Sequence, residues 1–180
     1  MATRLPADLY ADDVADEARR INHHQLTVLA ADVADVVRSA GGWLYDQARA
    51  GWDVIVWTPE DGDPRPLTIL GVRALDGDAI PGDLPDTGAV MVTAGLLRVD
   101  ADWRARVLAA VKRGGADVSV VGDWPEELGA PIEPVDHELS VAARAFKASA
   151  MSALDEADDA ASVETMFPLR TDALRPLYPV

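Results

Sequence analysis

One short pattern occurs twice in this chain and constrains its fold more than any other feature. A helix-type segment ends at a glycine, and Asp-Val-x-Val follows two residues later, once at 51–57 and again at 115–121. Short runs rich in β-branched residues are typical of buried strands. A helix that returns the chain to the edge of a sheet in this way is typical of α/β folds. The pattern therefore predicts two strands, each preceded by a helix, in one shared sheet.

Two further segments, 67–75 and 89–93, also read as strands. The connector 59–66 contains three prolines and a glycine, which makes it a turn. It is too short for a parallel crossover, which takes about a dozen residues or more. We therefore expect 67–75 to return antiparallel to the strand at 53–58, as a hairpin.

The unit 89–121 is expected to be a right-handed βαβ crossover. Its helix should begin with Asp100 or Asp102 as the N-cap and end at Gly114-Gly115.

The N-terminal part of the chain reads as helical. We expect a first helix over 12–22 and a second over 26–40, in which apolar residues recur at spacings of three and four. Gly41-Gly42 predicts a kink or a short break, because two glycines inside a helix cost about 2 kcal/mol relative to alanine. A last helix is expected from about Asp136.

Together these segments predict an α/β fold, with a mixed sheet of about four strands and packed helices, Rossmann-like or flavodoxin-like. An α+β arrangement with an N-terminal helical layer is the alternative. Residues 1–164 are expected to form a single domain. Residues 165–180 contain three prolines and no hydrophobic period, so they are expected to be an extended C-terminal arm.

The charge balance and the missing cysteine exclude several classes of protein. The chain has 16 Lys and Arg against 31 Asp and Glu, a formal net charge of −15. This argues against binding to nucleic acid or to an anionic membrane. Without cysteine there is no disulfide, thiolate metal site or cysteine nucleophile. Neither a signal-peptide pattern nor a membrane-spanning apolar stretch is found, so a cytoplasmic location is expected.

Ligands of open α/β sheets bind outside the carboxyl ends of the strands. The small residues after 89–93 would let a ligand approach the backbone, and Asp123 can accept from a hydroxyl or hold a cation through water. In the alternative interpretation the glycines only shape turns and Asp123 caps the next segment. The candidate ligand-binding residues are Thr93, Gly95, Gly122, Asp123 and Trp124.

Motifs with a defined chemistry are missing. No phosphate-binding glycine loop follows a predicted strand, and no serine lies in a nucleophile turn. His23, His24 and His137 do not have the spacing of metal ligands. The sequence therefore predicts no catalytic residue, no metal site and no cofactor.

Two functions remain. The preferred one is a non-catalytic module that binds a protein partner or a second copy of itself, because no acid/base group is evident and the arm 165–180 is too apolar to lie free in solvent. The alternative is a small-molecule or metal-dependent ligand-binding enzyme that uses the strand-end loops around Thr93 and Asp123. Whether the chain is an enzyme stays open at this point.

Overall fold

The computed structural model describes residues 24–60, 62–75, 84–85, 88–157 and 161–170. The elements in chain order are β1 (Gln25–Leu29), α2 (Val33–Arg49), β2 (Asp53–Trp57), α3 (Arg65–Ile69), β3 (Arg73–Ala74), β4 (Gly88–Thr93), α4 (Ala94–Val99), α5 (Ala101–Arg113), β5 (Ala116–Val121), the 3₁₀ turn η1 (Glu126–Leu128), β6 (Val135–Glu138), α6 (Val141–Ser152) and β7 (Val163–Leu169).

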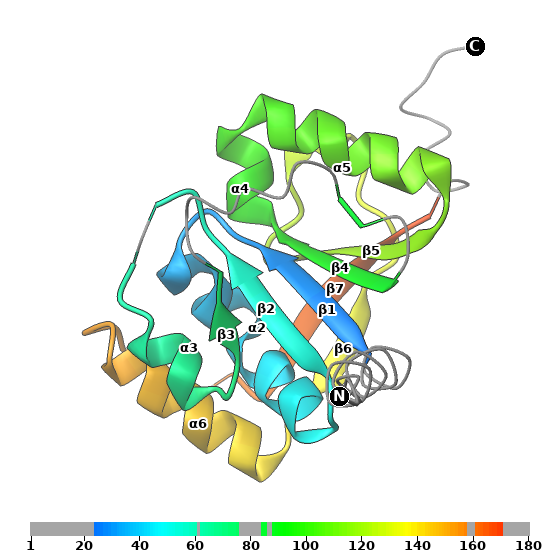
Figure 1. The fold of residues 1–180 in the computed structure, drawn as a ribbon. Helices are drawn as coiled ribbons and strands as arrows, with labels where there is room; N and C mark the ends of the chain where they lie inside the picture. The colour runs from blue at the N-terminus through cyan, green and yellow to red at the C-terminus, as the bar shows by residue number, and fades with distance from the viewer. Residues whose placement is uncertain (1–23, 61, 76–83, 86–87, 158–160, 171–180) are drawn as a thin grey trace, which may run out of the picture.

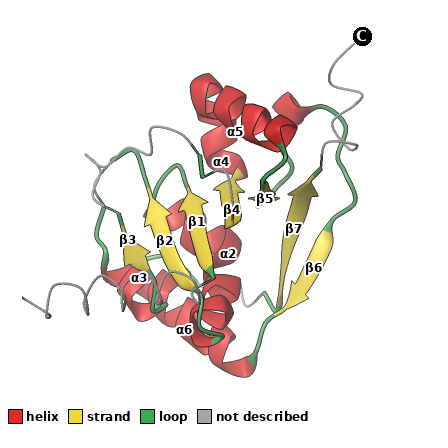
Figure 2. Cartoon of the chain, turned by 45° about the vertical axis from the view of Figure 1, so that its right-hand side comes forward, coloured by secondary structure: helices red, strands yellow, loops and turns green. Residues whose placement is uncertain are grey.

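The strands form one mixed sheet of seven, in the order β3-β2-β1-β4-β5-β7-β6. The five strands from β3 to β5 are parallel, whereas β7 runs antiparallel to both β5 and β6. Helices α2, α3 and α6 cover one face and α4 and α5 the other, which gives three layers (Figures 1 and 2).

Successive residues of the strands supply two separate cores, because side chains alternate between the faces of a sheet. In β4, Met91 lies in the core under α2, α3 and α6, while Val90 and Val92 lie in the core under α4 and α5. Both faces of the central strands are therefore apolar, as expected for parallel strands covered by helices on each side.

Helix ends follow local capping rules. The side chain of Asp32 accepts from the backbone N–H of Asp35 at 2.7 Å and begins α2. Asp100 caps α5 in the same way, and Gly114 ends that helix in the left-handed conformation with φ +65°.

The structure confirms the α/β class and the mixed sheet. The two Asp-Val-x-Val segments are in β2 and β5, in one sheet, with β1 and β4 between them. The helix expected from Asp100 to Gly114 is α5. The expected number of strands, about four, is wrong because the sheet has seven.

The first missed strand is β1, which lies in the middle of the sheet although 26–40 was expected to be a helix. Leu26, Val28 and Leu29 are buried, but the alternation of polar and apolar residues covers only the four positions from Gln25 to Val28. The spacing of Leu26, Leu29 and Val33 imitates a helix period across a strand–turn–helix boundary.

The expected hairpin at 67–75 is also wrong. A short helix, α3, occupies the first part of this segment, and β3 then pairs parallel with β2. Because α3 begins at Arg65, inside the connector 59–66, the crossover between β2 and β3 has the length that a parallel return needs.

Two strands near the C-terminal end were missed as well. Residues 135–138 form β6 where a helix was expected from Asp136, and α6 begins only at Val141. The expected boundary between the domain and the arm falls inside β7, whose residues 163–169 pair with β5 and β6. The expected helix at 12–22 and the rest of the arm, 171–180, lie outside the described residues. Within the described part of the chain, no helix combines the length and apolarity needed to cross a membrane.

Candidate functional site

The sheet has a point at which the chain changes direction. From β1 the chain continues to β2 on one side, and from β4 it continues to β5 on the other, although β1 and β4 are neighbours. The carboxyl ends of two such strands leave a crevice, which is where open α/β sheets bind their ligands. The turn after β1, the start of α4 and the loop after β5 meet at this edge.

Asp35 enters this edge from the first turn of α2. Its Oδ2 accepts a long hydrogen bond from the backbone N–H of Ala31, at 3.4 Å. The carboxylate lies directly against Gly95, where an added Cβ would come within 2.4 Å of Oδ2. Asp35 is half-buried, so its carboxylate is held by the backbone without being fully removed from solvent.

Ser39 follows one helical turn later on the same face of α2. A Cβ on Gly122 would lie 3.1 Å from Ser39 Oγ and 3.6 Å from the Cβ of Ala94. Gly122 also has φ +93°, which side-chain-bearing residues rarely adopt. The hydroxyl of Ser39 has no hydrogen-bond partner among the described residues. It is therefore a half-buried polar group at the end of β5, available to a ligand.

Thr93 stands behind this edge. Its side chain is fully buried, and its Oγ1 accepts from the backbone N–H groups of Ala31 and Leu96, both at 3.4 Å. The hydroxyl thus ties the turn after β1 to the start of α4. Thr93 thus helps to hold Ala31, whose backbone N–H also donates to Asp35 Oδ2.

Asp123 and Trp124 lie farther along the loop after β5. The carboxylate of Asp123 is exposed, and its backbone carbonyl accepts from Arg98 Nη2 at 2.7 Å. The indole N–H of Trp124 donates to the carbonyl of Gly129 at 2.9 Å, and its ring packs edge-on against Phe167. The structure thus brings Thr93, Gly95 and Gly122 together around Asp35 and Ser39.

Sequence reasoning missed Asp35 and Ser39 because it placed β1 inside a helix. A usable signal was present: Asp32 is an N-cap residue that follows the apolar run Thr-Val-Leu-Ala-Ala. Interpreted as strand, turn and helix start, this run would have placed the first turn of α2 at the carboxyl edge of the sheet.

A second polar cluster joins α2 to β6 and α6. Asp46 accepts from Ser140 Oγ at 2.7 Å, and its Oδ2 lies 3.2 Å from His137 Nε2. Burial raises the pKa of Asp46, but the hydrogen bonds from Ser140 and His137 lower it by more, so this pKa lies below its usual value. Because Asp46 lies between the serine and the histidine, the histidine cannot act as base on the serine, as a nucleophilic triad requires. This cluster caps α6.

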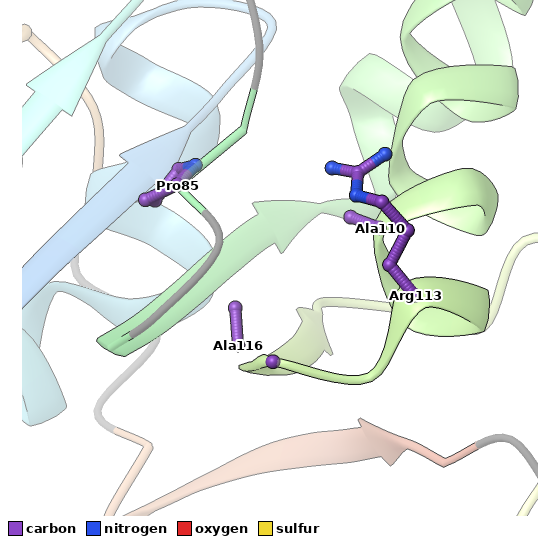
Figure 3. Close-up of a pocket in the computed structure, with 5 residues that line it drawn as sticks. Pro85, Ala110, Arg113 and Ala116 are labelled. Carbon is purple, nitrogen blue, oxygen red and sulfur yellow. The ribbon is translucent and has the colours of Figure 1, made fainter.

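A hollow of about 240 Å³ lies at the opposite, amino edge of the sheet. Figure 3 shows Arg113 of α5 above it, with Pro85, Ala110 and Ala116 around it. Its place at the amino ends of β4 and β5 separates it from the loops that form the candidate site, and we do not include it there.

No protein-family model matches the sequence, and no curated protein matches it either. Solved structures do match the fold. A deacetylase of the teicoplanin biosynthesis pathway, solved in complex with bog, superposes with a TM-score of 0.57 at 16% identity over 82% of this chain and 99% of that chain. The zinc-inhibited form of teicoplanin deacetylase Orf2 gives 0.56 at 15% identity over 82% and 99%. The A40926 pseudoaglycone deacetylase Dbv21 gives 0.51 at 16% identity over 82% and 97%.

Likeness at this level of identity shows a shared fold over nearly the whole length of those chains. It also corrects the preferred functional expectation. A non-catalytic binding or self-association module is wrong, because the solved structures that share this architecture are deacetylases, which are enzymes.

Because one of these neighbours was solved with zinc, we tested whether the residues at the site fit a metal ion. Among the described residues, no group of three or more His, Asp or Glu side chains is arranged to share one. Asp32 places another carboxylate near Asp35, and its Oδ1 accepts from the N–H of Asp35. The donors that the structure describes at this edge therefore do not fit a bound metal.

Proposed function

We propose that this protein is a small-molecule hydrolase of the deacetylase type, with its active site at the carboxyl edge of β1, β4 and β5. The observation that carries the proposal is the meeting of Asp35 and Ser39 with Gly95 and Gly122 at the switch point of the sheet. The deacetylase fold of the solved neighbours supports the same reaction class. The order β3-β2-β1-β4-β5 further supports a Rossmann-like rather than a flavodoxin-like sheet.

Deacetylation adds water to the carbonyl carbon of an N-acetyl group and breaks its C–N bond, releasing acetate and an amine. A carboxylate within reach of the water can take its proton and return it to the leaving amine. Asp35 is the carboxylate that the backbone holds at the crevice, so we assign it this role. The hydroxyl of Ser39 would donate a hydrogen bond to the carbonyl oxygen of the substrate, on which negative charge develops.

The glycines define where the two polar side chains lie. Gly95 and Gly122 carry no side chain at the two places where α2 approaches the strand ends, so Asp35 and Ser39 can lie directly against the backbone there. Asp123 and Trp124 would form the outer rim, the carboxylate meeting hydroxyl groups of the substrate and the indole offering an apolar surface.

The proposal is tested by incubating the protein with N-acetylglucosamine as a probe and measuring released acetate by proton NMR. Removal of a general base lowers the rate by about 10²–10⁴-fold, so Asp35→Asn should lose at least about a hundredfold. Ser39→Ala should lose about a hundredfold, the cost of removing one donor to the developing oxyanion. The matched control is Asp117→Asn, an exposed carboxylate at the amino end of β5, which should leave the rate unchanged.

Binding is measured separately by thermal shift with the same probe. A ligand at 100 times its dissociation constant stabilises by about 2.7 kcal/mol, and this gain should disappear in Asp123→Ala if the rim contributes. Acetate release that Asp35→Asn leaves unchanged would refute the assignment of the base. If a panel of N-acetyl sugars gives no acetate release and no thermal shift, the proposed function is refuted.

A further inference from the structure

The middle of α2 is held by a buried ion pair that the proposed reaction does not use. Nζ of Lys147, in α6, lies 2.9 Å from Oε1 of Glu164, in β7. Each of the two side chains is only 3% exposed. Lys147 Nζ also donates to the backbone carbonyl of Arg38, at 2.8 Å. Glu164 accepts from the backbone N–H of Gly42 at 3.0 Å and of Trp43 at 2.7 Å.

These contacts bring side chains to backbone groups in the middle of α2. In a regular helix the N–H groups of Gly42 and Trp43 donate to the carbonyls of Arg38 and Ser39. In α2 both N–H groups also have the carboxylate of Glu164 within hydrogen-bond distance, and the carbonyl of Arg38 accepts from an ammonium group.

The glycine pair makes room for this arrangement. A Cβ on Gly42 would lie 2.5 Å from Cδ1 of Leu139, and a Cβ on Gly41 would lie 3.5 Å from Cγ of Lys147. The helix does not break at these glycines, since α2 continues to Arg49. Instead, side chains of α6 and β7 form hydrogen bonds with the backbone in its middle.

The residues held by the pair adjoin the candidate site. Arg38, whose carbonyl bonds Lys147, is next to Ser39 and one turn from Asp35 along the same helix. A shift of α2 at this level would move both side chains relative to Gly95 and Gly122. Removing one partner of a buried ion pair leaves an uncompensated charge, so substitution of Lys147 or Glu164 alone should be destabilising.

We propose that Lys147 and Glu164 are positioning residues that fix the first half of α2, and with it Asp35 and Ser39, against the strand ends. This inference rests on the proposed function for the meaning of the site. Its test does not require activity.

The test compares assigned amide cross-peaks of Ala31, Gly95 and Gly122 in ¹H–¹⁵N NMR spectra of folded variants. Glu164→Gln retains the shape of the side chain but replaces one acceptor oxygen with an N–H₂ group, which cannot accept from Gly42 or Trp43. Hydrogen exchange at one of these two amides should rise by about tenfold or more, since hydrogen bonds to charged groups are among the stronger ones. The three site cross-peaks should shift.

The matched control is Glu156→Gln. Glu156 pairs with Arg38 of α2 at 2.8 Å, but this pair lies at the surface, where the side chain of Arg38 is 51% exposed and that of Glu156 32%. This variant should leave the three site cross-peaks in place.

A neutral pair of the same shape separates positioning from stability. Lys147→Met combined with Glu164→Gln leaves no unpaired buried charge, so much of the lost stability should return. The site cross-peaks should nevertheless remain shifted, because one N–H of α2 has lost the carboxylate oxygen that accepts from it in the unmodified protein. If the single or the double variant is folded and its three site cross-peaks coincide with those of the unmodified protein, the positioning role is refuted, whatever the outcome of the acetate assay.

Discussion

The carboxylate of Asp35 occupies the space that a side chain at Gly95 would need. A Cβ at residue 95 would come within 2.4 Å of Asp35 Oδ2 and 2.8 Å of its Cγ. Contacts this short between non-bonded heavy atoms are not tolerated, so the glycine and the position of the carboxylate depend on each other. The first turn of α2 and the first turn of α4 are thereby fitted together at the crevice.

Gly95→Ala should displace Asp35 and destabilise the protein by about 1–3 kcal/mol, the usual cost of overpacking. Urea unfolding measures this free energy. In an Asp35→Ala background the same substitution should cost much less, because the clash is gone. Equal costs in both backgrounds would show that the two residues are not in contact.

The two central glycines of α2 should respond in opposite ways. Gly41→Ala meets only ordinary contacts, at 3.5 Å, and gains up to about 1 kcal/mol of helix propensity. Gly42→Ala meets the buried side chain of Leu139 at 2.5 Å and should cost about 1–3 kcal/mol. Thermal unfolding of the two variants distinguishes them, and a stabilising Gly42→Ala would contradict the close approach of Leu139.

Asp46 should contribute to stability in a pH-dependent way. Its pKa is lower in the folded chain than its usual value of about 3.9, so its contribution is complete above that value and is lost as the pH falls through the folded pKa. Asp46→Asn should therefore lower the unfolding free energy most at neutral pH, and the difference from the unmodified protein should shrink below about pH 4. Urea titrations from neutral to acidic pH measure this, and a difference independent of pH would argue against a charged Asp46.

Trp57 carries the buried polar atom that lacks a partner within the described part of the chain. Its ring is 3% exposed and packs against Trp103 with centroids 4.9 Å apart, but its Nε1 has no acceptor. Trp57→Phe loses apolar area worth about 1–2 kcal/mol, yet removes an unpaired donor whose burial costs about 1–3 kcal/mol. The variant should thus be nearly as stable as the unmodified protein.

The matched comparison for Trp57 is Trp103→Phe. Trp103 lies in the same pair and has the guanidinium of Arg106 over its ring, at 4.9 Å from the centroid. Its substitution should be the more destabilising of the two in thermal unfolding, since it removes area and the cation–π contact without relieving an unpaired donor. The reverse order would show that Trp57 Nε1 is satisfied.

Much of the α/β framework could be read from local sequence. β2, β4 and β5 are short runs of β-branched residues bounded by glycine or proline, and α5 lies between the cap at Asp100 and the left-handed glycine at 114. Three of the expected ligand residues, Thr93, Gly95 and Gly122, followed from these strands and do meet at one edge. Whether they bind a ligand is left to the experiments above.

Those elements follow from local sequence because caps, turn residues and β-branched runs act within a few positions of one another. The other features depend on contacts between distant segments of the folded chain. β1 is too short for its own alternation to outweigh the helix-like spacing that continues into α2, while β7 becomes a strand by pairing with β5 and β6 by pairing with β7. The arrangement around α2 joins Arg38 and Gly42 to Lys147 and Glu164, which lie more than 100 residues later in the chain. No local pattern records such contacts, because their energy arises only when the folded sheet and helices exclude water from the space between them.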